Sequence, residues 1–287
     1  MKKSRVILYI IIVAGAFLYN FYYRPIPGNE LITEEFKQTS AYINNIYKSD
    51  EYFKNTVLSE ADKELYEKMI SMSLNDEEDT IIECEGKCDY KYGDIYSAIY
   101  LDHPELISYQ GLSVKTHDDY IEIINNFNLG KLQTYFGTRR IEREMDIIKR
   151  ETQGMTDKEK IIYVYDYVAS HNYDQIFMYS SSNQSAYSFF TKGTSVCAGF
   201  AKSSQMIFQN IGIESLPAVD NDHMWNYVKY EGKWYIFDAT VGASYTDKTS
   251  KGYYNGLGET TTDAVYGHFK KYYPVIESEK LRDIFKL

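Results

Sequence analysis

A loop, a helix start and a cysteine lie together in the stretch Gly193-Thr194-Ser195-Val196-Cys197-Ala198-Gly199-Phe200-Ala201. This combination indicates the fold of the chain. Thr194 and Ser195 are residue types that cap helices, since their hydroxyl oxygens accept hydrogen bonds from the first backbone N–H groups. We expect one of them to cap a helix over about residues 196–210. The pattern therefore predicts a cysteine in the first turn of a helix.

Two strand-like segments follow this helix. His223 opens the alternating run His223-Met224-Trp225-Asn226-Tyr227-Val228-Lys229, and Asp238 lies near the end of Lys233-Trp234-Tyr235-Ile236-Phe237-Asp238-Ala239-Thr240. The intervening Glu231-Gly232 is typical of a hairpin turn. Because His223 and Asp238 lie at similar distances from that turn, we expect their side chains to share one face of an antiparallel sheet.

Cys197, His223 and Asp238 supply a thiol, an imidazole and a carboxylate, which can act as nucleophile, general base and orienting group. The positive end of the predicted helix and a facing imidazolium would both lower the pKa of the thiol. Each residue alone is more often structural, as a small buried side chain, a strand residue or a turn residue. Their order on matched elements favours a single catalytic site.

The rest of the chain predicts an α+β fold in two parts. We expect helices over residues 31–75, 92–101, 138–153 and 157–169, a polar loop over 180–188, and strands over 106–109, 119–127 and 213–219. A boundary near residue 150 separates a helix-rich accessory domain, residues 25–150, from a compact α+β domain, residues 151–287.

Three motifs resemble the bacterial transglutaminase-like superfamily: residues 195–201 (SVCAGFA), 223–226 (HMWN) and 234–240 (WYIFDAT). The helix and loop over 159–174 are similar to the usual lead-in of that family. Residues 98–106 (AIYLDHPEL) are similar to the accessory segment of many exported Gram-positive members. The resemblance implies a papain-like core, in which a nucleophile helix packs on an antiparallel sheet.

The resemblance also implies a role for each residue of the site. Cys197 would be the nucleophile, His223 the general base and acid, and Asp238 the residue that orients the histidine. The family's oxyanion donors are a backbone N–H at the cysteine and one upstream side chain. Tyr173 and Tyr187 are the candidates for that side chain.

These features predict a cysteine acyl-transfer enzyme that acts on protein or peptide amides through a thioester. Water would complete a hydrolysis and an amine would complete a crosslink; we favour hydrolysis because water is always present. The chain departs from many relatives at Val241, where they have a tryptophan. No metal or organic cofactor is implied. The alternative is a surface binding or scaffolding module that keeps the fold without turnover.

The first 24 residues predict export. Lys2, Lys3 and Arg5 precede an uncharged run of 18 residues from Val6 to Tyr23, close to the shortest segment that spans a bilayer. A basic flank before an apolar run is typical of a membrane anchor, which we favour, or of a cleaved signal peptide. We therefore expect the protein at the extracellular face of the cell membrane, or secreted if the segment is cleaved.

The net charge of −10 bears on the partners of the protein. An acidic chain is poorly suited to nucleic acid and to anionic membrane surfaces, because both repel it. The expected partner is a protein or peptide substrate.

The chain has three cysteines, and two of them form a closely spaced pair. Cys84 and Cys88 are compatible with a tight local disulfide, with two free thiols, or with a zinc site that lacks a nearby second ligand pair. If the pair forms a disulfide, Cys197 remains as the odd thiol.

Overall fold

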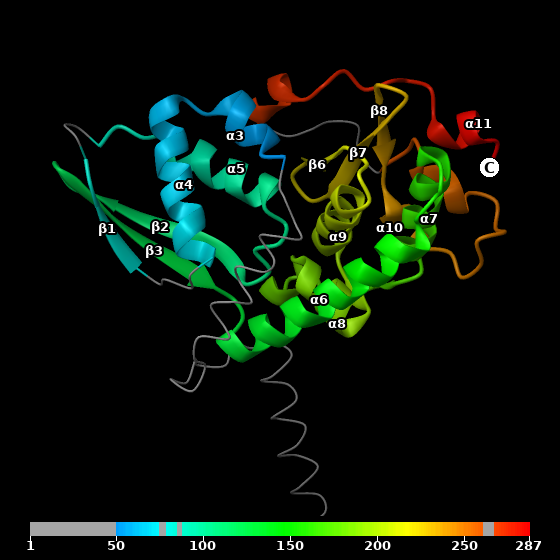
Figure 1. Ribbon diagram of the computed structural model, residues 1–287, viewed down its shortest axis with the longest axis horizontal. Helices are drawn as coiled ribbons and strands as arrows, with labels where there is room; N and C mark the ends of the chain where they lie inside the picture. Colours follow the sequence, from blue (N-terminus) through cyan, green and yellow to red (C-terminus); the bar gives the residue numbers. More distant parts are fainter. Residues whose placement is uncertain (1–49, 75–78, 85–87, 261–266) are drawn as a thin grey trace, which may run out of the picture.

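The structure is a computed structural model that describes residues 50–74, 79–84, 88–260 and 267–287 (Figure 1). The predicted anchor or signal segment over residues 1–24 lies outside the described residues, as do the helices expected before residue 50. Within the described ranges, none of the helices has the length and apolar character needed to cross a membrane.

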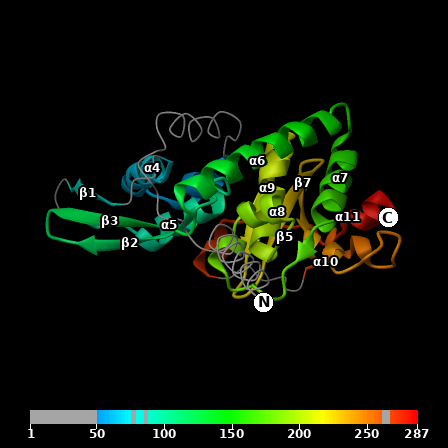
Figure 2. The ribbon, with the colours of Figure 1, turned by 90° about the horizontal axis from the view of Figure 1, so that it is seen from below.

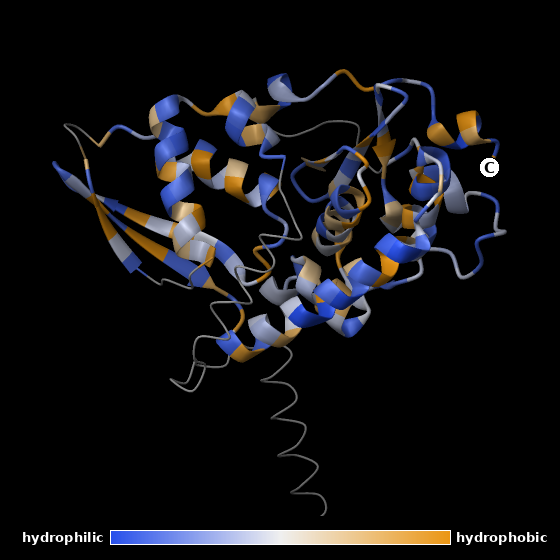
Figure 3. Cartoon of the chain, viewed as in Figure 1, coloured by the Kyte–Doolittle hydropathy of each residue, from blue (hydrophilic) through white to orange (hydrophobic). Residues whose placement is uncertain are grey.

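In its described residues, the accessory part has three helices packed beside a small antiparallel sheet (Figure 1). The strand order in this sheet is β1-β3-β2. Buried residues alternate with less buried ones along most of β3, as expected for a sheet with one buried face, and Figure 3 shows hydrophobic and hydrophilic residues mixed along the sheet. The elements are α3 (Tyr52–Val57), α4 (Glu60–Leu74), β1 (Asp79–Glu83), α5 (Tyr92–Asp102), β2 (Tyr109–Thr116) and β3 (Tyr120–Phe127).

The strand predicted over residues 106–109 was wrong in its bounds. Residues 106–108 form turns, in which the N–H of Leu106 bonds to the carbonyl of His103, and β2 begins only at Tyr109. The register of β2 against β3 shifts between Tyr109 and Gly111, and Gly111 has a φ of 149°. This irregularity interrupts the alternation of buried and exposed residues near the start of β2, so the bounds of the strand are hard to locate from the sequence. Strand β1 was not predicted.

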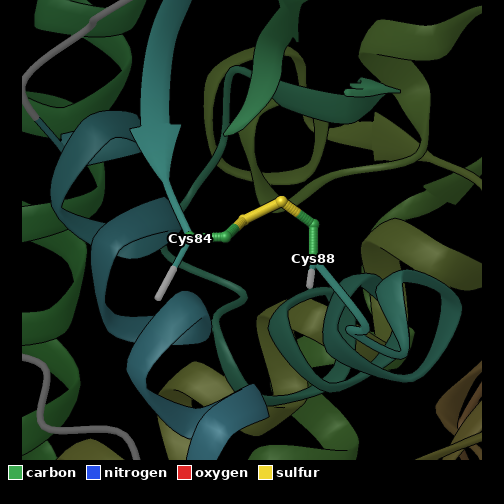
Figure 4. Close-up of a disulfide and its surroundings, with 2 residues drawn as sticks. All are labelled: Cys84 and Cys88. Atoms are coloured by element: carbon green, nitrogen blue, oxygen red, sulfur yellow. A yellow bond between two sulfur atoms is a disulfide. The ribbon is translucent and has the colours of Figure 1, made fainter. Parts of the chain in front are cut away.

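A disulfide joins Cys84, just after β1, to Cys88 before α5 (Figure 4). Of the three arrangements compatible with the sequence, the structure has the local bridge. Cys197 is then the free cysteine of the chain.

Helix α6 (Lys131–Glu151) connects the accessory part to the core. It begins seven residues earlier than predicted, because Gly130 caps it and the side chain of Gln133 accepts a hydrogen bond from the Gly130 N–H at 3.1 Å. Figure 2 shows α6 running along α8 and α9. Its buried face includes Ile141, Met145 and Ile148. The domain boundary near 150 stays a prediction, and α6 ends close to it.

The core has the predicted α+β architecture, in which the helix that begins at Cys197 packs on an antiparallel sheet of order β6-β7-β8. Helix α7 begins with the predicted capping box, since Thr156 and Glu159 exchange hydrogen bonds with each other's backbone N–H. The main elements are α7 (Asp157–Ala169), α9 (Cys197–Asn210), β6 (Ser215–Val219), β7 (Met224–Tyr230), β8 (Lys233–Phe237) and α10 (Ala239–Ala243).

Short elements complete the core. Strand β4 pairs in parallel with β5, beside the start of α9. The polar loop predicted over 180–188 was wrong at its end, because Ala186, Tyr187 and Ser188 are buried and belong to a helix. These elements are β4 (Asn172–Tyr173), η1 (Ser181–Asn183), α8 (Ala186–Lys192), β5 (Thr194–Ser195), η2 (Tyr253–Gly256), η3 (His268–Tyr272) and α11 (Leu281–Phe285).

The predicted cap of the helix at Cys197 was wrong. Val196 is the capping residue, in an extended conformation, and no side chain caps the helix. The Ser195 hydroxyl donates instead to the carbonyl of Asn183 at 2.9 Å and lies 2.7 Å from the hydroxyl of Ser188. Ser195 therefore fixes the segment before the helix to α8 and η1.

The accessory part contacts α9 directly. The Gln205 side chain donates to the carbonyl of Leu101 at 2.9 Å, and the ammonium of Lys202 lies 3.6 Å from the centre of the Tyr100 ring. Ala198 and Ala201 of α9 pack in the same hydrophobic cluster as the accessory helices. Helix α9 is thus buried between the accessory helices and the core sheet.

Candidate active site

The hairpin between β7 and β8 positions His223 and Asp238. Glu231 and Gly232 both have positive φ angles, which is the conformation of a tight hairpin turn. Asn226 pairs with Phe237 in the register of the two strands, so continuing the register brings Asp238 opposite Trp225. His223 is two residues before Trp225 and therefore on the same face as Asp238, at a diagonal position.

The two side chains meet in a hydrogen bond of 2.7 Å between His223 Nε2 and Asp238 Oδ2. Asp238 is buried, and it also accepts hydrogen bonds from the N–H of Thr240 at 3.1 Å and from the Thr260 hydroxyl at 2.8 Å. With Nε2 bound to the carboxylate, Nδ1 is the ring nitrogen left to interact with a thiol.

Cys197 is the first residue of α9 and is partly exposed. Burial raises the pKa of its thiol, but the hydrogen bond and positive charge of His223 outweigh this effect. The backbone N–H of Met224 and the Tyr173 hydroxyl lower the pKa further. The result is a thiol pKa below its ordinary value, which favours the thiolate.

The pKa of His223 is shifted in the opposite direction, upward. Burial lowers its pKa, but hydrogen bonds to Asp238 and Cys197 and the charges of both groups raise it to about 10. Trp225 stacks on the imidazole with a ring separation of 5.7 Å and an angle of 14°. The geometry and charges therefore favour a thiolate–imidazolium pair at neutral pH.

The structure brings one of the two candidate oxyanion donors to this site. The Tyr173 hydroxyl interacts with both the side chain and the backbone N–H of Cys197, and burial and the sulfur charge raise its pKa to about 12. Tyr187 lies instead in the hydrophobic core, where its ring would meet a Cβ added at Gly137. Tyr173 is thus positioned to contact a reacting group, and Tyr187 is not.

A cleft of about 900 Å³ opens beside His223. One part of its wall comes from the segment around β4, and another part comes from α10 and the residues after it. Val241, where the family resemblance led us to expect a tryptophan, belongs to the second group. The lining residues are Asn172, Tyr173, Gln175, His223, Thr240, Val241, Ala243, Ser244 and Tyr245.

Thr260 belongs to this site and was missed by the sequence analysis. It lies 22 residues beyond Asp238, and no recognisable motif surrounds it. Thr240 had a local signal, because a threonine two residues after an aspartate often returns a backbone hydrogen bond to the carboxylate.

No cluster of three or more His, Cys, Asp or Glu side chains suited to a metal ion occurs in the part of the chain that the structure describes.

Residues 146–239, about a third of the chain, match the transglutaminase-like superfamily. The matched segment contains Cys197, His223 and Asp238. The chain therefore contains a transglutaminase-like domain, and the resemblance seen in the sequence is confirmed for this segment. No curated protein matches the chain.

Three solved structures are similar to part of the chain. A crystal structure of a TGase has 14% identity and a TM-score of 0.31 over 56% of this chain and 50% of its own. A protein from Cytophaga hutchinsonii, proposed to be a cysteine protease, has 13% identity and a TM-score of 0.30 over 45% and 61%. A proposed protease from Parabacteroides distasonis has 12% identity and a TM-score of 0.28 over 44% and 36%. The chain spans less than two thirds of each.

Proposed function

We propose that this protein is a cysteine acyl-transfer enzyme that acts on protein or peptide amides. One observation carries the proposal: His223 lies between the Cys197 thiol and the buried carboxylate of Asp238, with a 2.7 Å hydrogen bond to the latter. A thiolate, a protonated imidazole and an orienting carboxylate are the groups that amide cleavage through a thioester requires.

In the first half of the proposed reaction, the Cys197 thiolate adds to the carbonyl carbon of an amide, and the carbonyl electrons move to the oxygen. In this proposal the Cys197 N–H and the Tyr173 hydroxyl, which interact with each other in the free enzyme, both donate hydrogen bonds to that oxyanion once the substrate is bound. The intermediate collapses with cleavage of the C–N bond, and the imidazolium of His223 gives its proton to the leaving amine or ammonia. A thioester on Cys197 remains.

In the second half, neutral His223 takes a proton from water while the oxygen adds to the thioester carbonyl. The C–S bond breaks, the carboxylic acid leaves, and the thiolate–imidazolium pair is restored. An amine in place of water would give a new amide. We favour hydrolysis, because water reaches an open cleft without a dedicated acceptor site.

We also propose that the enzyme acts outside the cell, at the extracellular face of the membrane. The basic and apolar first 24 residues support this location. The disulfide between Cys84 and Cys88 supports it as well, since disulfides persist in oxidising compartments.

The proposal is tested by alkylation of Cys197 with iodoacetamide, followed by mass spectrometry. Because the thiol pKa is lowered, labelling at about pH 6 should be at least tenfold faster than that of free cysteine. His223→Ala removes the hydrogen bond and the charge that lower this pKa, so its labelling should become slow at about pH 6 and recover at alkaline pH.

The alternative is a binding or scaffolding module of the same fold without turnover. It predicts a Cys197 that reacts no faster than free cysteine, and a labelling profile that His223→Ala leaves unchanged. Either result would remove the basis for the enzyme proposal.

A further inference from the structure

A run of large apolar side chains is exposed next to the candidate site. Ile176, Phe177, Met178 and Tyr179 follow one another, and Ile176 and Tyr179 are 82% and 92% exposed. We call residues 175–179 the apolar loop. Elsewhere in the described ranges, exposed side chains of this kind occur singly or at most as two near neighbours on one helix. Contiguous exposed apolar groups of this kind mark interaction sites.

The sequence segment that contains the apolar loop carries no charged side chain. The sequence has no Asp, Glu, Lys or Arg between Asp174 and Lys192, although the whole chain has a net charge of −10. The loop side chains themselves offer a charged partner no complementary group, whereas an apolar partner could contact them without removing a charged side chain of this segment from water. The loop is therefore suited to apolar side chains.

The backbone of the apolar loop is held in one conformation. Asp174 Oδ1 accepts from the N–H groups of Ile176 and Phe177, at 2.9 and 2.8 Å. The Asn183 side chain donates to Asp174 Oδ2 at 2.8 Å and to the Phe177 carbonyl at 3.1 Å. A loop fixed in this way presents its side chains without a large ordering cost on binding.

The apolar loop is continuous with the cleft. Tyr173, which interacts with Cys197, and Gln175 both line the cleft together with His223. The chain is tied to the start of α9 here, because β4 pairs with β5 and the N–H of Asp174 donates to the carbonyl of Ser195 at 2.8 Å. Gln175 is the point where the cleft and the apolar loop meet, so a polypeptide that leaves the cleft past Gln175 would reach the apolar loop.

We propose that the apolar loop recognises an apolar or aromatic side chain of a polypeptide substrate, next to the carboxamide that Cys197 attacks. Ile176 and Tyr179 supply most of the exposed contact surface. The inference rests on the proposed function, and it adds a substrate class: polypeptides with large apolar residues beside the reacting amide.

The test uses binding, so that it does not depend on turnover. The full chain carrying Cys197→Ala is titrated into two fluorescein-labelled peptides, one with the sequence Phe-Gln-Leu and one with Ser-Gln-Ser between glycines, and anisotropy is recorded. The Phe-Gln-Leu peptide should bind about tenfold more tightly, because apolar side chains discriminate by this order of magnitude. Adding Ile176→Ser and Tyr179→Ser should remove that preference.

Ile81→Ser is the matched control, because Ile81 is also exposed but lies on β1 in the accessory sheet (Figure 1). It should leave the preference intact. The proposal is overturned by equal or absent binding of both peptides, or by a preference that survives the two loop substitutions. Attachment of the loop to phosphatidylcholine vesicles, without a peptide preference, would also overturn it. Iodoacetamide labelling of Cys197 in the unsubstituted chain tests the proposed nucleophile separately. Fast labelling without a peptide preference would contradict only the role of the apolar loop, whereas slow labelling would contradict the proposed function.

Discussion

Asp238 is the residue that fixes the geometry of the candidate site. It is buried and accepts hydrogen bonds from His223, from the Thr240 backbone and hydroxyl, and from Thr260. A carboxylate with its lone pairs satisfied in this way keeps one orientation, and the imidazole that it binds does too. Thr260 is informative because its hydroxyl binds Oδ2, the same oxygen that binds His223.

Thr260→Val should loosen this arrangement. The valine keeps the shape of the side chain but removes the 2.8 Å hydrogen bond to Asp238. A hydrogen bond of this kind contributes about 1 kcal/mol, so the rate of Cys197 labelling at about pH 6 should fall by about fivefold. Thr260→Ser retains the hydroxyl and should label at nearly the original rate. Equal rates for both variants would mean that Thr260 does not position Asp238.

The residues of the site differ in how far the sequence can predict them. Cys197, His223 and Asp238 lie in motifs whose helix and strand patterns can be recognised locally, and the structure brings them together. Their catalytic role remains a proposal. Thr260 comes from a distant segment without a pattern, and only the folded chain shows its contact with Asp238.

At the scale of elements, the start of α9 depends on close packing rather than on a capping side chain. A Cβ added at Gly199 would lie 1.8 Å from the Ser195 Oγ and 2.9 Å from the Ser185 carbonyl oxygen. The absence of a side chain at Gly199 therefore allows the helix to approach the segment that precedes it. The sequence predicted a serine or threonine cap here because cap preferences are local, whereas the packing of Ser195 against α8 is not.

Gly199→Ala should destabilise the protein and impair the site. The added methyl would displace Ser195, and overpacking of this kind costs about 1–3 kcal/mol. Gly93→Ala is the matched control, since Gly93 also lies in a helix but a Cβ there meets nothing within 4 Å. It should be neutral or stabilising by up to about 1 kcal/mol. Urea unfolding measures both, and a Gly199→Ala protein as stable as the Gly93→Ala protein would contradict the packing argument.

At the scale of the whole molecule, α9 ties the two parts together. Its first residue is the candidate nucleophile, one face packs on the core sheet, and Ala198, Lys202 and Gln205 contact the accessory helices. The sequence predicted the helix itself over about residues 196–210. The buried lysine on it could not be predicted, because lysine is ordinarily a surface residue. Its burial results from the accessory part covering α9.

Lys202→Met should change how the free energy of unfolding depends on pH, because it removes the buried amine. Burial lowers the pKa of Lys202 to about 7, and the negative charge of Glu105 opposes this effect only in part. Between about pH 7 and the ordinary value of 10.5, the unfolded chain binds more protons than the folded chain, so this lysine makes stability rise with pH. Lys202→Met removes that slope. When the pH is lowered from about 9.5 to 7, the free energy of unfolding of the Lys202→Met protein should increase by about 3 kcal/mol relative to that of the unsubstituted protein. Urea unfolding at both pH values measures this difference. Lys251→Met, at an exposed position, should show no such change; a pH-independent difference for Lys202→Met would mean that the lysine stays protonated in the folded protein.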